Sequence, residues 1–419
     1  MKIILVLLNY FVFLYPLYMS FVWTVGGLLF YFRRERRPLP KINKYPAFSI
    51  IVPARNEEKN IEETVRLLKG LNYPVYEVIV VNDGSSDKTK AILDRLLKEY
   101  PHWLKVVHLT PNSGKANASN VGIALCKGEL VLVMDADCHL EPQTLTMLAY
   151  HFVNSSRVAA VTGNPRIINR TTLIGKIQVG EYTSIIGLIK RSQRLLGKIL
   201  TVSGVIAAYR KSALIECGMF DADTVTEDID ITWKLQKRFW EIRYEPRALC
   251  WILSPETIKG LWNQRVRWSQ GGLEVIKKHA DVWKDWRQRR FWPIYVEYAA
   301  AICWMFSLGL LIVNWCAQYG LYALHFLEHA PKQPFVPPGW AGSVLALVCL
   351  VQFMASLYID SHYEKKTLLK YYFWIIWYPL FYWIISALTV FVGVFNVFIK
   401  KGGVTSRWES PDRGIHTLQ

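Results

Sequence analysis

Two polar clusters in the C-terminal half of the sequence have the composition of a reaction site. The stretch TVTEDIDITWKL holds Glu227, Asp228 and Asp230. Nearly forty residues later, NQRVRWSQGG holds Gln264, Arg265, Arg267 and Trp268 within five positions. A carboxylate can deprotonate a hydroxyl group, and arginine can hold a phosphate. An aromatic ring can stack on the face of a sugar. These residue types predict transfer chemistry on a phosphate-linked sugar.

Alternating strand and helix patterns in the N-terminal half predict the scaffold for this chemistry. Apolar runs predict strands at 48–54, 76–82, 104–109 and 129–135, and helical patterns lie at 57–69, 87–100, 115–124 and 141–152. Such alternation with continuously apolar strands indicates a parallel sheet covered by helices on both faces. Ligands bind beyond the carboxyl ends of the strands in such sheets. We expect the sheet to end near residue 160, with helical spacing over 173–214.

Charged residues follow all four predicted strands. They are Arg55 and Glu57 after the first strand, Asp83 after the second, Lys115 in the loop NSGKANASN after the third, and Asp135 and Asp137 after the fourth. The sequence has no GxGxxG motif after its first strand and no Walker lysine loop, which are the usual backbone cradles for phosphate. Two neighbouring carboxylates can instead hold Mg²⁺ or Mn²⁺, which neutralises a diphosphate. The strand ends therefore predict a nucleotide and metal site, with Asp135 and Asp137 as metal ligands.

Ordinary structural roles compete with these interpretations. Asp83 precedes a glycine, and aspartate is common in turns. Glu227 and Asp228 precede a predicted helix over 229–238, where acidic residues stabilise the N terminus. That role alone explains Asp230. The alternative interpretation of Lys115 is a solvated surface lysine. The alternative for the NQRVRW stretch is an interfacial helix that lies on lipid headgroups.

Long apolar segments predict a membrane protein. Hydrophobic residues make up 52% of the chain, and residues 3–32 carry no charge before the basic cluster RRERR at 33–37. Further apolar segments rich in Trp and Tyr lie at 293–324, 341–359 and 371–398. The net charge of +17 fits basic flanks beside anionic lipid, so we expect no nucleic-acid partner. Basic flanks face the cytoplasm, which predicts a cytoplasmic catalytic segment.

The predicted order of parts has one conflict at its C-terminal end. The parts are a transmembrane helix with its basic flank (1–37), a cytoplasmic domain (46–255), interfacial helices (256–290), transmembrane helices (291–400) and a tail (401–419). Three spans after the domain would leave the basic tail outside, against the charge rule. Either the last apolar segment is broken or re-entrant, or the segment at 293–324 crosses more than once. The seven cysteines form no CxxC pair, which predicts free thiols rather than a zinc site.

The order of the motifs VNDGSSD, NSGKANASN, DAD, TED and QRVRW resembles the family-2 processive glycosyltransferases, which include cellulose, chitin and hyaluronan synthases. The resemblance covers nearly the whole chain. Further stretches, such as TGNPRI, GKIQVGEY, TVSGVIAAYR and SPDRGI, are similar to the bacterial members that make a β-1,6-linked N-acetylglucosamine exopolysaccharide of biofilms. The resemblance implies an α/β nucleotide-sugar glycosyltransferase domain of the GT-A type, joined to a helical transmembrane domain in the bacterial inner membrane.

The resemblance also implies a role for each candidate residue. The residues that bind the donor, UDP-N-acetylglucosamine, would be Arg55, Glu57, Asp83, Lys115, Asp135 and Asp137. The catalytic residues would be Asp228 and Glu227. The residues that bind the acceptor and the diphosphate would be Gln264, Arg267 and Trp268. Asp83 would contact the uridine, and Asp228 would be the general base. Transfer would be a single inverting displacement that depends on Mg²⁺ or Mn²⁺.

The implied partners are the growing polymer, which would pass through the membrane helices, a small membrane subunit, and cyclic di-GMP. The sequence contains no recognisable separate domain for cyclic di-GMP. A synthase of another β-linked polysaccharide (hyaluronan, chitin or cellulose) and a single-sugar transferase to a lipid carrier remain alternatives. A transporter subunit or scaffold without enzymatic activity would be expected to have lost at least one of Asp83, Asp135, Asp137 and Asp228.

Overall fold

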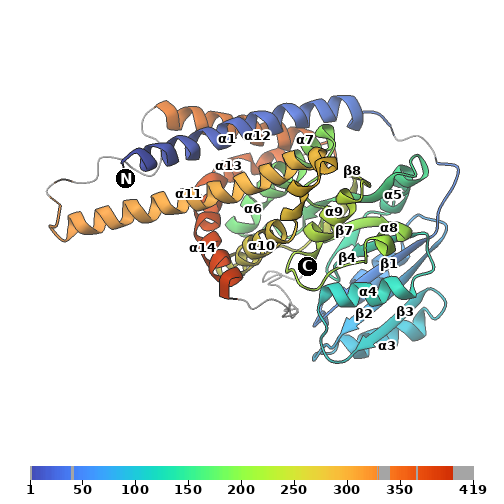
Figure 1. The fold of residues 1–419 in the computed structure, drawn as a ribbon. Coiled ribbons are helices and arrows are strands. Elements are labelled where there is room, and N and C mark those ends of the chain that lie inside the picture. The colour runs from blue at the N-terminus through green and yellow to red at the C-terminus, as the bar shows by residue number, and fades with distance from the viewer. Residues whose placement is uncertain (1, 39–41, 328, 330–339, 365–366, 400–419) are drawn as a thin grey trace.

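The computed structural model places an α/β domain beside a bundle of long helices that come from both ends of the chain (Figure 1). The structure describes residues 2–38, 42–327, 329, 340–364 and 367–399. The bundle is built from α1 (Lys2–Phe30), α11 (Trp292–Ala323), α12 (Trp340–Asp360) and α14 (Ile384–Ile399). The sheet strands and their helices lie between α1 and α11 in the sequence, so the domain is inserted into the bundle.

The N-terminal half of the domain has the predicted alternation of strands and helices. The elements are β1 (Phe48–Ala54), α2 (Ile61–Lys69), β2 (Tyr76–Asp83), α3 (Thr89–Glu99), β3 (Leu104–Leu109), α4 (Lys115–Leu125), β4 (Leu130–Met134) and α5 (Thr144–Val153). The four strands are parallel in the order β3-β2-β1-β4. Ile50 of β1 packs in one hydrophobic cluster and Ile51 in another, on the opposite face. Both faces of the sheet are therefore covered, which explains the continuously apolar strands.

The prediction that the sheet ends near residue 160 is wrong. The sheet has eight strands in the order β3-β2-β1-β4-β7-β6-β8-β5. The added strands are β5 (His139–Leu140), β6 (Val158–Ile167), β7 (Ile206–Arg210) and β8 (Glu241–Ile252). Because β7 pairs antiparallel with both β4 and β6, the sheet is mixed rather than parallel. The strand β7 falls inside 173–214, where helical spacing was expected; its short, alanine-containing sequence IAAYR carries little strand signal.

Helices α6 (Leu173–Gly180) and α7 (Ile189–Leu196), joined by a π-helical stretch (Glu181–Leu188), do occupy the first part of the 173–214 region. After β7 come the short α8 (Lys211–Glu216) and then α9 (Glu227–Lys237), which begins at the acidic cluster. The long α10 (Ile258–Lys278) carries the QRVRW motif and leads to α11 through two 3₁₀ turns. Of these, α6 and α7 pack against both the sheet and the bundle, and α10 packs against α9 and α14.

Four helices in the described part of the chain are long and apolar enough to cross a membrane: Ile3–Glu35, Trp292–Ala323, Gly342–Asp360 and Pro379–Phe398. The second is one continuous helix, so the alternative of a double crossing there is wrong. The last predicted segment is broken, with a 3₁₀ turn (Thr367–Tyr371), the four-residue α13 (Tyr372–Ile375) and a π-helical turn from Pro379 before α14. Proline lacks the amide hydrogen that a continuous helix needs. The predicted basic tail at 401–419 lies outside the described residues.

Buried ion pairs join the domain to the bundle. Arg191 of α7 pairs with Glu35 at the end of the first membrane helix (2.7 Å) and with Asp360 at the end of α12 (2.7 Å). Arg166 of β6 pairs with the other oxygen of Asp360 at 2.8 Å. We call Arg166, Arg191, Glu35 and Asp360 the junction network. It fixes the sheet against two membrane helices.

Candidate active site

A cavity of about 530 Å³ lies where the sheet, α9, α10 and the membrane helices meet. Most of the predicted site residues line it: Lys115, Asp135, Asp137, Glu227, Asp228, Gln264, Arg267 and Trp268. These residues are distant in the sequence, and the fold brings them to one space. Arg55, Glu57 and Asp83 are not among the lining residues.

Lys115 connects the two acidic clusters. Its Nζ lies 2.6 Å from Oδ1 of Asp135 and 3.2 Å from Oε1 of Glu227. Burial alone would lower the pKa of Lys115, but the carboxylates of Asp135 and Glu227 outweigh burial and raise it. Lys115 is therefore a fixed cation at the first turn of α4, where the free amides also favour an anion.

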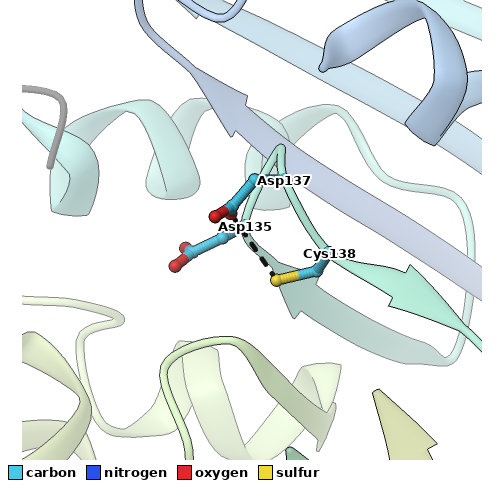
Figure 2. Close-up of side chains that lie close together, drawn as sticks. All are labelled: Asp135, Asp137 and Cys138. Carbon is cyan, nitrogen blue, oxygen red and sulfur yellow. Dashed lines mark hydrogen bonds between the residues drawn. The ribbon is translucent and has the colours of Figure 1, made fainter. Parts of the chain in front are cut away.

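The carboxylates of Asp135 and Asp137 form an acidic site directly after β4 (Figure 2). Ligand atoms of Asp135, Asp137 and Cys138 lie within 4.8 Å of one another. Burial raises the pKa of the Cys138 thiol well above its ordinary value, so the sulfur stays protonated, 3.7 Å from Oδ1 of Asp137. Mg²⁺ and Mn²⁺ prefer oxygen ligands. The two carboxylates fit such a cation, and the neutral thiol does not.

Asp228 stands in the first turn of α9, beside the cavity. Burial, together with the negative charge of Glu227, raises the pKa of Asp228 to about 6. A carboxylate with this pKa is ionised at neutral pH and binds a proton more readily than an ordinary aspartate, which suits a general base. Gly204 faces it: a Cβ at that position would lie 3.2 Å from Oδ2 of Asp228. Sequence reasoning missed Gly204, because its neighbour in space is distant in the chain.

Two glycines let α10 pack closely against its neighbours. A Cβ on Gly271 would overlap the side chain of Thr226, and one on Gly272 would overlap the hydroxyl of Tyr298 in α11. Neither contact leaves room for a side chain. The backbone amide of Val225 also donates to the Glu274 carboxylate at 3.0 Å. Gly271 therefore lets α10 approach the acidic cluster, and Gly272 lets it approach α11.

The two arginines of QRVRW have different surroundings. Arg265 is buried, forms an ion pair with Glu181, and places its guanidinium 4.2 Å from the centre of the Trp268 ring. Arg267 is exposed and lines the cavity. The buried side-chain oxygen of Gln264 has no hydrogen-bond partner in the described part of the chain. Arg265 thus holds Trp268 in place, while Arg267 and Gln264 remain available to a ligand.

Asp83 is fully buried and organises the loop before Lys115. Its Oδ1 accepts hydrogen bonds from the amide (2.7 Å) and hydroxyl (2.9 Å) of Ser113, and its Oδ2 accepts from the amide of Gly114 (2.9 Å). Gly114 has φ +90°, a conformation that favours glycine. Arg55 donates to the backbone carbonyl of Asp83 at 2.9 Å, and the backbone amide of Glu57 donates to Thr89. A donor-binding role for Arg55, Glu57 and Asp83 stays a prediction.

The cavity continues from Asp228 into the helix bundle. Its membrane side is lined by large aromatic and polar side chains from four helices: Tyr15 and Trp23 of α1, Tyr298 and Trp304 of α11, Gln352 of α12, and Trp383 just before α14. The Trp304 and Trp383 rings contact each other edge to face, with centroids 5.2 Å apart. Tryptophan rings beside polar groups suit a sugar chain, whose faces are apolar and whose edges are polar.

Comparison with known proteins identifies the class. Residues 49–218 match the family described as Glycosyl transferase family 2. The chain is 39% identical over 415 residues to poly-β-1,6-N-acetyl-D-glucosamine synthase of Staphylococcus epidermidis, covering 96% of this chain and 98% of the relative. It is 38% identical over 413 residues to the synthase of the same name from Staphylococcus aureus strain COL, with the same coverage. The chain belongs to glycosyl transferase family 2, and the resemblance expected from its motifs is confirmed.

A solved structure supports the same fold. The mannosyltransferase PcManGT from Pyrobaculum calidifontis, solved in complex with GDP-Man and Mn²⁺, matches with a TM-score of 0.58 and 20% identity. The match covers 94% of this chain and 99% of that one. The predicted GT-A-type domain with membrane helices is confirmed at the level of the fold. The two synthases and the four long apolar helices together make the protein a membrane glycosyltransferase.

Proposed function

We propose that the protein polymerises N-acetylglucosamine from UDP-N-acetylglucosamine into a β-1,6-linked exopolysaccharide. One observation carries the proposal: a single cavity runs from Lys115 and the Asp135–Asp137 pair, past Asp228, into the helix bundle. A transferase that adds sugars repeatedly needs the donor, the base and an exit for the product in one continuous space. The similarity to the staphylococcal synthases over nearly the whole chain supports the donor and the linkage.

Each group in the cavity has a place in this reaction. Mg²⁺ or Mn²⁺ held by Asp135 and Asp137 would neutralise the charge of the UDP diphosphate. Lys115 and Arg267 add positive charge for the same diphosphate. Asp228 takes the proton of the acceptor hydroxyl as its oxygen bonds to the anomeric carbon, and the bond from that carbon to UDP breaks. One displacement of this kind inverts the anomeric configuration and gives a β-linkage from an α-linked donor.

The membrane side of the cavity supports coupling of synthesis to export across the inner membrane. Trp268 holds the acceptor end, and the tryptophans of the bundle give the lengthening chain a path between the helices. The basic cluster after α1 favours a cytoplasmic position for the catalytic domain. A small membrane subunit and cyclic di-GMP, implied by the family resemblance, remain predicted partners.

The product identifies the reaction. Membranes containing the chain, with and without its small membrane partner, receive labelled UDP-N-acetylglucosamine and Mg²⁺, and the insoluble product is treated with a β-1,6-specific hexosaminidase. We expect labelled polymer that the enzyme digests. A polymer that the hexosaminidase does not digest would support processive synthesis but exclude the β-1,6 linkage. Label found only in lipid would show single-sugar transfer to a carrier instead.

A further inference from the structure

Lys190 of α7 is a buried cation that has no partner among the described residues. Four lysines and arginines in the described part of the chain are buried: Arg166, Lys190, Arg191 and Arg265. The three arginines each form an ion pair with a buried carboxylate. Lys190 is 5% exposed, and no described residue forms an ion pair or hydrogen bond with its ammonium group.

A buried charge without a partner lowers the stability of the folded protein unless a ligand pairs with it. An unpaired charge in a protein interior loses its hydration and regains little in return. Burial lowers the pKa of Lys190 to about 8, and the negative charge of Asp228 opposes this effect without a direct contact. Lys190 is one of the residues that line the cavity, so a molecule in the cavity can contact its side chain.

The position of Lys190 separates it from the donor end. Gln193, one turn later on α7, donates to Glu297 of α11 at 3.0 Å, and Trp23 of α1 donates to the same carboxylate at 3.2 Å. These bonds attach α7 to two membrane helices, and all three residues line the cavity with Lys190. Lys115, in contrast, sits against Asp135 and Glu227. Lys190 therefore lines the cavity within electrostatic range of Asp228, on a helix that is attached to the membrane helices.

We propose that Lys190 binds the acceptor end of the growing polysaccharide. Its ammonium group donates hydrogen bonds to hydroxyl or acetamido oxygens of the terminal sugar and so holds the attacking hydroxyl beside Asp228. A neutral sugar offers only oxygen acceptors of this kind, and three N–H donors can bind several of them. The assignment rests on the proposed function, because it deepens the acceptor site of that reaction.

Binding measurements test Lys190 without turnover. Purified wild type, Lys190→Gln and Lys190→Arg are titrated with a β-1,6-linked N-acetylglucosamine oligosaccharide and, separately, with UDP and Mg²⁺. We expect Lys190→Gln to weaken oligosaccharide binding about tenfold, the usual effect of losing a hydrogen bond to a charged group, and to leave UDP binding unchanged. Lys190→Arg should retain most of the affinity, because it keeps a cationic donor.

Lys198 provides a matched control. Burial also lowers the pKa of Lys198 to about 8. Unlike Lys190, it is not a lining residue of the cavity, and it donates to the backbone carbonyl of Gln236. Lys198→Gln should leave both affinities unchanged. Thermal unfolding of all variants checks folding, and we expect Lys190→Gln to unfold no earlier than wild type, because it removes an unpaired buried charge.

Three results would overturn the assignment. These are unchanged oligosaccharide binding in Lys190→Gln, an equal loss of UDP binding, and a wild type that binds no oligosaccharide. A parallel titration with a β-1,4-linked oligosaccharide separates this proposal from the proposed function. If only the β-1,4 chain binds, and does so through Lys190, the role of Lys190 stands and the proposed linkage is wrong.

Discussion

Two groups of buried charges in this protein differ in how completely they are paired. In the junction network, Arg191 contacts both Glu35 and Asp360, and Arg166 contacts Asp360, so positive and negative charges balance. In the cavity, the ammonium of Lys190 has no partner among the described residues, and Asp228 keeps a raised pKa. A paired network holds two parts of a protein together. A charged group without a partner is suited to bind a substrate, although it lowers the stability of the folded protein.

Replacing the base should have the largest effect on activity. Asp228→Asn keeps the shape of the side chain and removes the group that accepts the proton. We expect polymer synthesis to fall by about 10²- to 10⁴-fold, the usual contribution of a general base, with UDP binding retained. Radiolabel incorporation and UDP titration measure the two quantities.

Asp230 is the matched control for Asp228. It lies two positions later, is fully buried, and accepts from His279 at 2.8 Å, so it fastens α9 to the end of α10. Asp230→Asn should lower thermal stability while the folded fraction keeps its rate per molecule. If Asp228→Asn makes polymer at the normal rate, or if only Asp230→Asn loses polymer synthesis, Asp228 is not the base.

Breaking the junction network should affect stability rather than chemistry. Arg191→Met leaves the carboxylates of Glu35 and Asp360 buried without their shared partner. We expect a loss of about 3–5 kcal/mol in the free energy of unfolding, which is typical when one partner of a buried ion pair is removed. Thermal unfolding in detergent measures it. A variant as stable as wild type would contradict the role given to the network.

The acidic pair after β4 should determine the metal dependence of donor binding. Asp137→Ala should weaken UDP binding in the presence of Mg²⁺ about tenfold or more, because it removes a charged ligand. Binding without metal should change little. Cys138→Ala, next to it, should leave metal dependence unaltered, since the thiol is protonated. Unchanged metal dependence in Asp137→Ala would reject the site.

The pH dependence of polymer synthesis reports on the protonation of Asp228. Because burial and Glu227 raise the pKa of Asp228 to about 6, its carboxylate takes up a proton as the pH falls through that value. The rate of synthesis should therefore be full above this pKa and decline below it, at a higher pH than an ordinary aspartate would give. A rate that stays constant between about pH 7 and pH 5 would contradict the assigned pKa.

Removing the aromatic ring at the acceptor end should have the smallest effect. Trp268→Ala should reduce polymer formation several-fold and leave UDP binding nearly unchanged, because stacking contributes about 1 kcal/mol. Chain-length analysis of the product measures the change. An equal loss of UDP binding would indicate a folding role, through the contact with Arg265.

The first half of the sheet was predictable because β1, β2 and β4 are buried on both faces and read as continuous apolar runs. Strand ends in a parallel sheet meet at one edge, so the places of Lys115, Asp135 and Asp137 followed from the pattern. The second half was not, because β7 pairs antiparallel with β4 and β6 and its short sequence IAAYR carries little strand signal. Lys190 stands in the stretch SIIGLIKR, which is similar to the bacterial synthases but gives the lysine no role of its own. Its lack of a partner is a property of the surrounding packing and could not be read from neighbours in the sequence.

The central claim is that one cavity holds donor, base and product. It is tested most directly by a cryo-electron microscopy structure of Asp228→Asn with UDP-N-acetylglucosamine, Mn²⁺ and a β-1,6 oligosaccharide. We predict the diphosphate beside Lys115 and the Asp135–Asp137 pair, and the terminal sugar between Trp268 and Lys190, with the chain directed toward the bundle. A nucleotide bound elsewhere, or an oligosaccharide that leaves the cavity without entering the bundle, would contradict the account.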